Sequence, residues 1–465
     1  MNENKEDEKR RRNYIKNFFL YLIIINAIFY LCFKFIIKNE KNNNFSPIKE
    51  DITKIKIGDG KMAKIGIISD IQLGGKYTPD SSKLFQNNLL KALIYFKKNN
   101  IDILIIAGDI TNDGKAVNYL LFNTIFYSVY NYNQTTPIVI SLMGNHDYMD
   151  RKSDIIQNQQ KFFKYMKSYP YSHYIINNYN FIFWSNDNYN YNDKGIQDFS
   201  WIKMSLEKAK NNKIKEGDPI FVITHIPPMK TVYGSEGMWG SYGIFEAIKN
   251  YPEVICISGH SHYSLRNIKS IWQGNFTVIN TQSLSYTDLD DFYKNARYVR
   301  EDSMKNDSMG LIAYLNDKNI IFERVEFSTE EIEEEKWKID FPINISNFIY
   351  SFDKRNKKVK PIFSDKNEIQ IEKIKINNAF KNYIVFNAAS HEDYVYTYKI
   401  VLKNKDINRE YFYYSDYYKN KRLRKERLKF ELSDNISRGK YDVKIYAIDS
   451  FDNISEPKIG VIQIE

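Results

Sequence analysis

Cysteine is nearly absent from this sequence. Only two occur among the 465 residues: Cys32 lies in an N-terminal apolar segment and Cys256 in a predicted core strand. They support neither a disulfide framework nor a cysteine-based metal site, and they leave the cellular compartment open. Histidine is also scarce, with six residues in all, so the position of each one carries information.

The composition also lacks the features of a disordered or strongly charged chain. Hydrophobic residues make up 43% and aromatic residues 15%, which indicates a chain that folds. Lysine and arginine total 67 against 57 acidic residues, a net charge of +10. Because Lys, Asn, Ile and Tyr are frequent throughout, this charge follows from the general composition and does not favour a nucleic-acid partner. The length predicts two domains and an appendage.

One long apolar run lies near the N-terminus. Phe18–Ile37 is apolar with two polar interruptions, and about 20 residues are enough to cross a bilayer. A basic cluster precedes the run, so the amino terminus is expected to stay in the cytoplasm. We predict a basic tail at 1–16, an uncleaved membrane anchor helix at 17–37 and an extracytoplasmic tether at 38–61. A cleaved signal peptide and a buried soluble helix are the alternatives.

Five short apolar runs in the middle of the chain each end in a polar loop. The runs are 65–69, 101–107, 137–142, 220–224 and 254–258, and the loops carry, in that order, Asp70 and Gln72, Asp109, Asn145 and His146, His225, and His260 and His262. Because ligand sites gather at the carboxyl ends of strands in α/β sheets, these loops are predicted to meet. The other two histidines, His173 and His391, belong to no such pattern and are interpreted as surface or packing residues.

Strands and helices alternate from residue 62 to residue 328. This order predicts an α/β domain in which two sheets form a sandwich flanked by helices. Helical spacing of apolar residues recurs over 84–98, 117–130 and 199–210. Residues 329–345 contain an acidic run and are predicted to be a linker, with a short helix as the alternative. After residue 346 the helical patterns stop, and six short strands predict a β-sandwich over 346–465, similar in pattern to fibronectin type III or immunoglobulin-like modules.

Taken together, Asp70-x-Gln72, Gly108-Asp109, Gly144-Asn145-His146-Asp147, His225 and Gly259-His260-x-His262 resemble the calcineurin-like metallophosphoesterase superfamily. The resemblance covers residues 62–327 and implies two divalent metal ions bridged by Asp109. It implies that Asp70, Gln72 and His262 complete the first metal site, and that Asn145, His225 and His260 complete the second. It further implies hydrolysis of a phosphate mono-, di- or pyrophosphate ester by metal-bound hydroxide.

The same resemblance gives His146 a catalytic role, in transition-state stabilisation or protonation of the leaving oxygen. In the protein-phosphatase branch an acidic residue orients this histidine, but Asn112 stands at that position here. Asp113 is the nearest carboxylate and is the candidate for that role. Gln72 replaces a histidine of the common motif. Since an amide oxygen is a harder and weaker ligand than imidazole, the first site is expected to favour Mn²⁺ or Mg²⁺, with Fe or Zn as alternatives.

The glycine-rich stretch Tyr233–Gly240 follows His225 and is predicted to be a loop beside the metals. Trp239 or Tyr233 would either stack on a substrate ring or pin the loop, and the sequence leaves both open. A non-catalytic surface binding protein that retains the fold is the alternative to an enzyme, and Gln72 is the feature in its favour. A glycan or protein ligand of the C-terminal module is a further hypothesis.

Overall fold

The structure is a computed structural model. It describes residues 45–75, 79–131, 136–185, 199–289, 307–364, 368–376, 379–432 and 436–465. Pro47–Glu465 form one compact unit, and the predicted tail and anchor helix at 1–37 lie outside the described residues. Within the described ranges, no helix is both long and apolar enough to cross a membrane.

The first of two central sheets has seven strands in the order β1-β5-β6-β7-β8-β10-β9. These strands are β1 (Thr53–Ile55), β5 (Tyr171–Ile176), β6 (Tyr179–Trp184), β7 (Ile220–Thr224), β8 (Val254–Ser258), β9 (Ile271–Gln273) and β10 (Thr277–Asn280). From β6 through β7 and β8 to β10 the strands run parallel. The apolar runs predicted at 220–224 and 254–258 are therefore adjacent strands that end at the same edge of this sheet.

The second sheet has the order β13-β12-β11-β2-β3-β4, and β14 also pairs with β12. Its strands are β2 (Ala63–Ile68), β3 (Ile103–Ala107), β4 (Ile138–Leu142), β11 (Met309–Leu315), β12 (Asn319–Glu326), β13 (Glu331–Ile332) and β14 (Trp337–Asp340). The strands β2, β3 and β4 are parallel neighbours. The other three predicted apolar runs thus also end at one edge.

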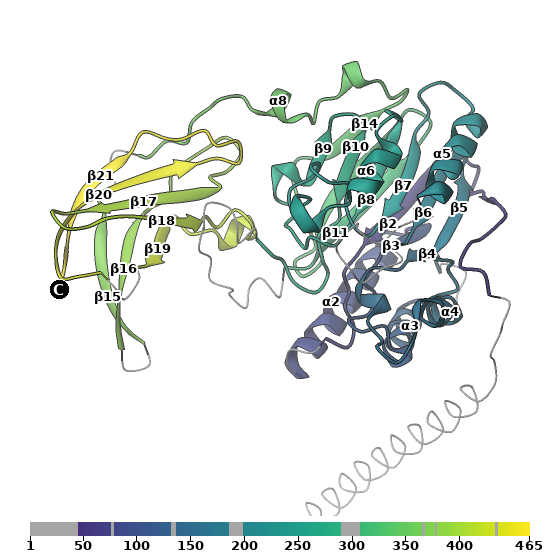
Figure 1. Cartoon of the computed structure of the whole chain (residues 1–465), viewed down its shortest axis with the longest axis horizontal. Coiled ribbons are helices and arrows are strands. Elements are labelled where there is room, and N and C mark those ends of the chain that lie inside the picture. The colour runs from purple at the N-terminus through teal and green to yellow at the C-terminus, as the bar shows by residue number, and fades with distance from the viewer. Residues whose placement is uncertain are drawn as a thin grey trace, which may run out of the picture. The chain divides into compact units, whose positions relative to one another are not determined.

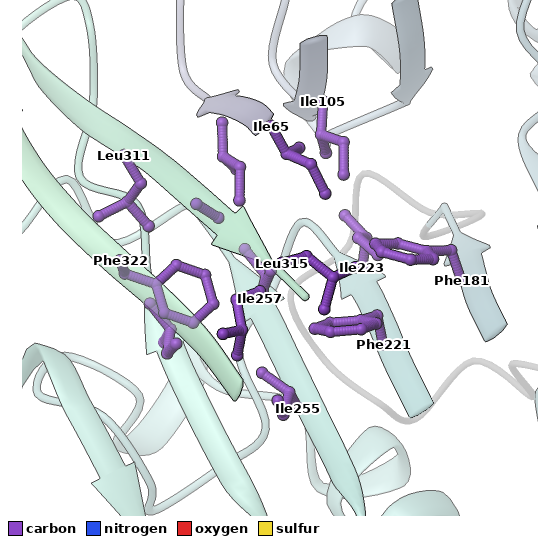
Figure 2. Packing of buried hydrophobic residues seen from close by; sticks show 14 of the residues in the cluster. Ile65, Ile105, Phe181, Phe221, Ile223, Ile255, Ile257, Leu311, Leu315 and Phe322 are labelled. Atoms are coloured by element: carbon purple, nitrogen blue, oxygen red, sulfur yellow. The ribbon is translucent and has the colours of Figure 1, made fainter. Parts of the chain in front are cut away.

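The two sheets share one apolar core. In Figure 2, Ile65 and Ile105 of the second sheet point toward Phe221 and Ile257 of the first, and all four are buried. The rings of Phe181 and Phe221 stack with their centroids 4.3 Å apart. Alternate residues of a strand face opposite sides of a sheet, so the core receives every second residue of each strand. This packing holds the strand ends that carry the polar loops.

Helices cover the outer face of each sheet, as Figure 1 shows. Leu104 and Ile106 of β3 point away from the shared core and pack against three helices in a second cluster. These helices are α2 (Pro79–Lys98), α3 (Ala116–Tyr130) and α4 (Ile155–Met166). The helices α5 (Ser200–Asn212) and α6 (Tyr242–Ile248) pack against the outer face of the first sheet in a third apolar cluster. Burial on both faces explains why the strand sequences are continuously apolar.

Two segments differ from the sequence prediction. Residues 329–345, predicted to be a linker, contain β13 and β14, and both strands pair with β12. Trp337 of β14 is fully buried beneath the guanidinium of Arg324, which lies 4.6 Å from its ring. The predicted tether at 38–61 contains β1, which pairs in parallel with β5. Strands of two to four residues are too short to show an alternation of apolar and polar residues. They can be recognised only from the strands with which they pair.

The C-terminal module contains two antiparallel sheets with the orders β15-β16-β19 and β18-β17-β20-β21. Their bounds are β15 (Gln370–Ile376), β16 (Ala379–Asn387), β17 (Thr397–Lys403), β18 (Asn408–Tyr414), β19 (Arg427–Glu431), β20 (Gly439–Ile448) and β21 (Lys458–Ile464). Residues from both sheets form one apolar cluster. The six predicted strands are present, and β18, with Asn408 and Arg409 at its start, is an addition to them.

Strand β4 offers a matched test of the shared core. Ile140 is 2% exposed and packs in that core, whereas Ile138 on the same strand is 41% exposed. Ile140→Ala is expected to lower the free energy of unfolding by about 2–5 kcal/mol, and Ile138→Ala by less than about 1 kcal/mol. Urea denaturation of the full chain, followed by tryptophan fluorescence, measures both. Equal losses would contradict the assignment of Ile140 to the core.

Candidate metal centre

The polar loops at the strand ends of the two sheets meet at one place. From the second sheet, β2 leads to Asp70 and Gln72, β3 to Asp109, and β4 to Asn145 and His146; from the first, β7 leads to His225 and β8 to His260 and His262. Except for His146, each of these side chains is buried. The loops converge as predicted, and hydrogen bonds join the loops of one sheet to those of the other.

Five of these residues have a left-handed backbone conformation. Their φ angles are 51° for Asp70, 50° for Gln72, 52° for Asp109, 73° for His260 and 58° for His262. This conformation costs an L-residue about 1–2 kcal/mol and concentrates at functional sites. Backbone hydrogen bonds hold it: the amide of Asp70 donates to Gly108 O at 3.0 Å, and the amide of Gln72 donates to Asp109 O at 2.9 Å.

Glycine is required next to two of these loops. Gly108 has a φ of 91°, and a Cβ there would collide with the His225 ring. A Cβ on Gly144 would collide with the carboxylate and backbone of Asp109. These glycines allow the loops after β3, β4 and β7 to approach within hydrogen-bonding distance.

Two fully buried carboxylates form the centre of the site. Asp109 Oδ2 lies 3.3 Å from His225 Nε2, and Asp70 Oδ1 lies 3.1 Å from His262 Nε2 and 3.8 Å from His225 Nε2. Burial raises the pKa of a carboxyl, but here the pKa of Asp70 is lowered by the imidazoles of His262 and His225. For Asp109, His225 and His146 overcome burial and hold the pKa far below its usual range. Both groups therefore carry negative charge.

His225 is oriented by a backbone carbonyl. Its Nδ1 donates to Ala107 O at 2.8 Å, and Nε2 consequently faces Asp109 and Asn145 Oδ1, the latter at 3.1 Å. Burial opposes a charged imidazole, but Asp109 and Asp70 raise the pKa of His225 to about 9. By contrast, burial and the neighbouring His225 lower the pKa of His260 to about 3. In the absence of a cation, a proton on His225 therefore balances part of the charge of the carboxylates.

This donor set fits a metal ion. Ligand atoms of Asp70, Asp109 and His225 all lie within 4.8 Å of one another, and all three residues are buried. Buried carboxylates need a compensating cation, and mixed nitrogen and oxygen donors suit Mn, Fe, Zn or Co. The outer nitrogen of His225 is held by a carbonyl, which is the usual arrangement for a ligating imidazole. The site can therefore hold a divalent metal.

Gln72 reaches the same centre. Its Nε2 lies 3.4 Å from His262 Nε2, while its Oε1 accepts from Ser285 Oγ at 3.1 Å. A 180° turn of the amide exchanges these two atoms, so that the oxygen faces the centre while the nitrogen donates to Ser285. The position of Gln72 is thus compatible with the predicted oxygen ligand.

His146 lies at the rim of the site with its side chain 24% exposed. Its backbone amide donates to Asp109 Oδ1 at 2.8 Å, and its Nδ1 lies 3.0 Å from Asn112 O. Nδ1 therefore carries a proton, and Nε2 faces Asp109 Oδ2 at 3.9 Å. The predicted orienting residue, Asp113, instead accepts from Asn118 Nδ2 at 2.7 Å and pairs with Lys115. A backbone carbonyl, not the Asp113 carboxylate, orients His146.

Asp147 is a residue of the site to which the sequence analysis gave no role. It is fully buried and accepts hydrogen bonds from the backbone amides of Gly144, Ile110 and Thr111 and from two hydroxyls, those of Thr111 and Tyr119. Burial, together with the charge of Asp109, raises its pKa to about 6. The hydrogen bonds of Asp147 join the loop after β3 to the loop after β4. The only feature of the sequence that pointed to this residue was its position next to His146.

A cavity of about 120 Å³ opens over the centre. Besides the predicted ligands and His146, its walls are Trp239, Ser261, Tyr263, Tyr286, Asp288 and Leu289. The ring of Trp239 lies 5.3 Å from that of His260, and the ring of Tyr286 lies 4.4 Å from that of His262. Aromatic side chains therefore flank the histidines, and of these the sequence indicated only Trp239. Tyr233 does not line this cavity.

Removal of the central carboxylate tests the metal site. Asp109→Asn preserves the left-handed backbone, which Asn tolerates, but removes a buried negative charge. It is expected to weaken divalent-metal binding by about 100-fold or more. Asp113→Asn is the matched control because that carboxylate binds Asn118 and Lys115 instead. Calorimetric titration of chelator-stripped protein with Mn²⁺ measures both variants. Equal weakening in both would show that Asp109 acts only through the fold.

A match to a protein-family model agrees with this site. Residues 63–264 match the family model described as calcineurin-like phosphoesterase. No curated protein sequence matches the chain.

Among solved structures, a dimetal phosphatase from Danio rerio is 11% identical, with a TM-score of 0.40 and coverage of 60% of this chain and 99% of its own. GAP50, the anchor in the inner membrane complex of Plasmodium, is 16% identical, with a TM-score of 0.43 and coverage of 62% and 92%. A purple acid phosphatase from yellow lupin (Lupinus luteus) is 12% identical, with a TM-score of 0.41 and coverage of 60% and 54%.

The motifs at the strand ends and the family model agree: residues 63–264 of this chain match the calcineurin-like phosphoesterase family.

Proposed function

We propose that this chain hydrolyses a phosphate ester with two divalent ions held between the two sheets. The observation that carries the proposal is that the contacts among the predicted ligands fall into two sets. Asp70 and Gln72 both contact His262, at 3.1 and 3.4 Å, whereas His225 contacts Asn145 and Asp109, at 3.1 and 3.3 Å. The two sets of contacts are neighbours, because Asp70 Oδ1 also lies 3.8 Å from His225 Nε2, and they support two adjacent ion sites.

These contacts support the following assignment of ligands. Asp70, Gln72 and His262 would hold one ion, and Asn145, His225 and His260 would hold the other. Asp109 would serve both, since its carboxylate reaches His225 and the backbone amide of His146. When bound, the two ions would supply a nucleophilic water and neutralise the charge on the phosphate oxygens. The harder oxygen donor of Gln72 supports Mn²⁺ as the preferred ion.

His146 performs the proton chemistry in this proposal. The bond to Asn112 O fixes the ring so that Nε2 faces the cavity and Asp109. A protonated Nε2 stabilises charge on the phosphoryl oxygens and donates its proton to the leaving oxygen. Since Nδ1 is committed to the carbonyl, the ring keeps this orientation through the reaction.

The predicted anchor adds a location to the proposal. If residues 17–37 cross the membrane with the basic tail inside, the phosphoesterase domain faces the outside of the cell membrane. The substrate would then be an extracellular nucleotide, a phospholipid headgroup or a cell-wall phosphate. Reaction of a membrane-impermeant reagent with residues of the domain in intact cells tests this orientation, and protection of the domain would contradict it.

The first test of the function is hydrolysis of p-nitrophenyl phosphate and bis-p-nitrophenyl phosphate. Chelator-stripped protein is expected to be inactive, and single additions of Mn²⁺, Mg²⁺, Zn²⁺ or Fe²⁺ are expected to restore activity, most strongly with Mn²⁺. His146→Ala is expected to lower kcat by about 10²–10⁴-fold with unchanged metal content, because its ring is not a proposed ligand. His173→Ala is the control, since that ring is buried against Asn180 away from the site.

Two results would contradict the assignments. Loss of metal in His146→Ala would make the ring a ligand. A folded chain without activity on either ester after metal addition would favour the alternative of a surface binding protein. A bound metal content well below two equivalents would support that alternative further.

Gln72→His tests the first metal site separately. Imidazole is a stronger ligand than an amide oxygen for Mn, Fe and Zn, so the substitution is expected to tighten metal binding by about tenfold. Competition with a chelating dye measures the affinity. Gln159→His, on α4, is the control. An affinity that does not change would show that Gln72 is not a ligand.

A further inference from the structure

The C-terminal module contacts two loops that reach the metal site. Residues 47–465 form one compact unit, so these contacts belong to a single packed body. The first loop, 227–241, follows His225 and carries Trp239 to the cavity. The second segment, 263–269, follows His262. Both are contacted by tyrosines that flank β17 and β18.

Tyr233 connects the first loop to the module. Its hydroxyl is hydrogen-bonded to the hydroxyl of Tyr396, and the two rings meet edge to face at 5.7 Å. On its other side, Tyr233 packs against Tyr263, a wall of the cavity, with ring centroids 4.9 Å apart. Its backbone amide donates to Lys269 O at 3.0 Å. Tyr233 therefore joins the module to both loops.

The second segment is held by three further tyrosines. Ile268 N donates to Tyr394 Oη at 2.8 Å, and Tyr394 Oη in turn donates to Asn267 Oδ1 at 3.1 Å. Asn267 Nδ2 donates to Tyr417 Oη at 3.4 Å. The neighbouring residue, Arg266, donates to Tyr418 O at 3.1 Å. These bonds begin four residues after His262.

A buried cluster of charges around Arg266 lies beneath this contact. Its guanidinium is buried and pairs with Asp307, Glu326 and Glu333 at 2.7, 2.5 and 2.8 Å. Asn420 of the module donates to the same Glu326 at 2.7 Å. Separation of the module from the domain would remove the hydrogen bonds that Tyr418 O and Asn420 make with these buried charges.

The cavity wall itself is part of the same packing. Leu289, which lines the cavity, is 2% exposed and belongs to an apolar cluster with four tyrosines of the module. These are Tyr396, Tyr414, Tyr417 and Tyr418. The module therefore supports the cavity at three places: the Trp239 loop, Tyr263 and Leu289.

We propose that the C-terminal module shapes the substrate pocket, with Tyr396 as a positioning residue that acts through Tyr233 on Trp239 and Tyr263. This inference rests on the proposed phosphoesterase function. The metal ligands lie at strand ends fixed by the shared core, whereas these pocket walls are fixed by the module. Loss of the Tyr233–Tyr396 hydrogen bond should therefore change substrate binding and leave the metals in place.

A double-mutant cycle tests this proposal in the full chain loaded with Mn²⁺, with bis-p-nitrophenyl phosphate as substrate. Tyr233→Phe and Tyr396→Phe each keep the ring and remove one hydroxyl. Each is expected to raise KM by about three- to tenfold, the effect of one hydrogen bond, with kcat and metal content within about twofold of the unchanged chain. The double variant is expected to match either single variant, because both remove the same bond.

Tyr383→Phe is the matched control. Its hydroxyl bonds to Glu431 at 3.2 Å within the other sheet of the module, so KM should not change. Trp239→Ala should raise KM as well, and addition of Tyr396→Phe to it should have little further effect. Additive effects of Tyr233→Phe and Tyr396→Phe, or an unchanged KM in both, would overturn the inference. An inactive unchanged chain would instead contradict the proposed function, so the two failures are distinguishable.

Discussion

The buried charge of Asp70 and Asp109 is the constraint on which this structure depends. Two carboxylates without solvent are unstable unless positive charge lies beside them, and the chain supplies imidazoles from two different sheets for this purpose. Bringing them together requires a left-handed backbone at five residues, a local cost of about 1–2 kcal/mol each. The apolar core between the sheets offsets that cost, because its strands fix where each loop begins.

Much of this arrangement could be predicted from the sequence, since it is local. Each apolar run contains a largely buried strand and is followed within three residues by a ligand-type side chain, as in Ile220–Thr224 and His225. The short strands were not predictable. Strand β1 pairs with β5, which lies more than 100 residues further along the chain, and β14 pairs with β12. Three or four residues carry no periodicity of their own, so neither strand could be recognised without its partner.

Within the site, the features that could not be predicted from the sequence depend on backbone atoms and on tertiary packing. His146 is oriented by the carbonyl of Asn112, and a carbonyl is present at every position, so only the carboxylate of Asp113 was visible as a candidate. The role of Asp147 depends on amides of another loop. The walls at Tyr286 and Leu289 are aromatic and aliphatic residues without a motif, and only the folded chain brings them to the cavity.

The site therefore has two supports of different origin. Strand ends hold the proposed metal ligands, and the packing of two sheets makes those positions insensitive to the loops above them. The aromatic walls depend on a tyrosine contact with a module whose sequence has no metal-binding pattern of its own. Under the proposed function, a change at Tyr396 would thus alter which ester fits without affecting the chemistry at Asp109, while a change in the core would affect both. This separation lets the pocket vary while the metal centre is kept.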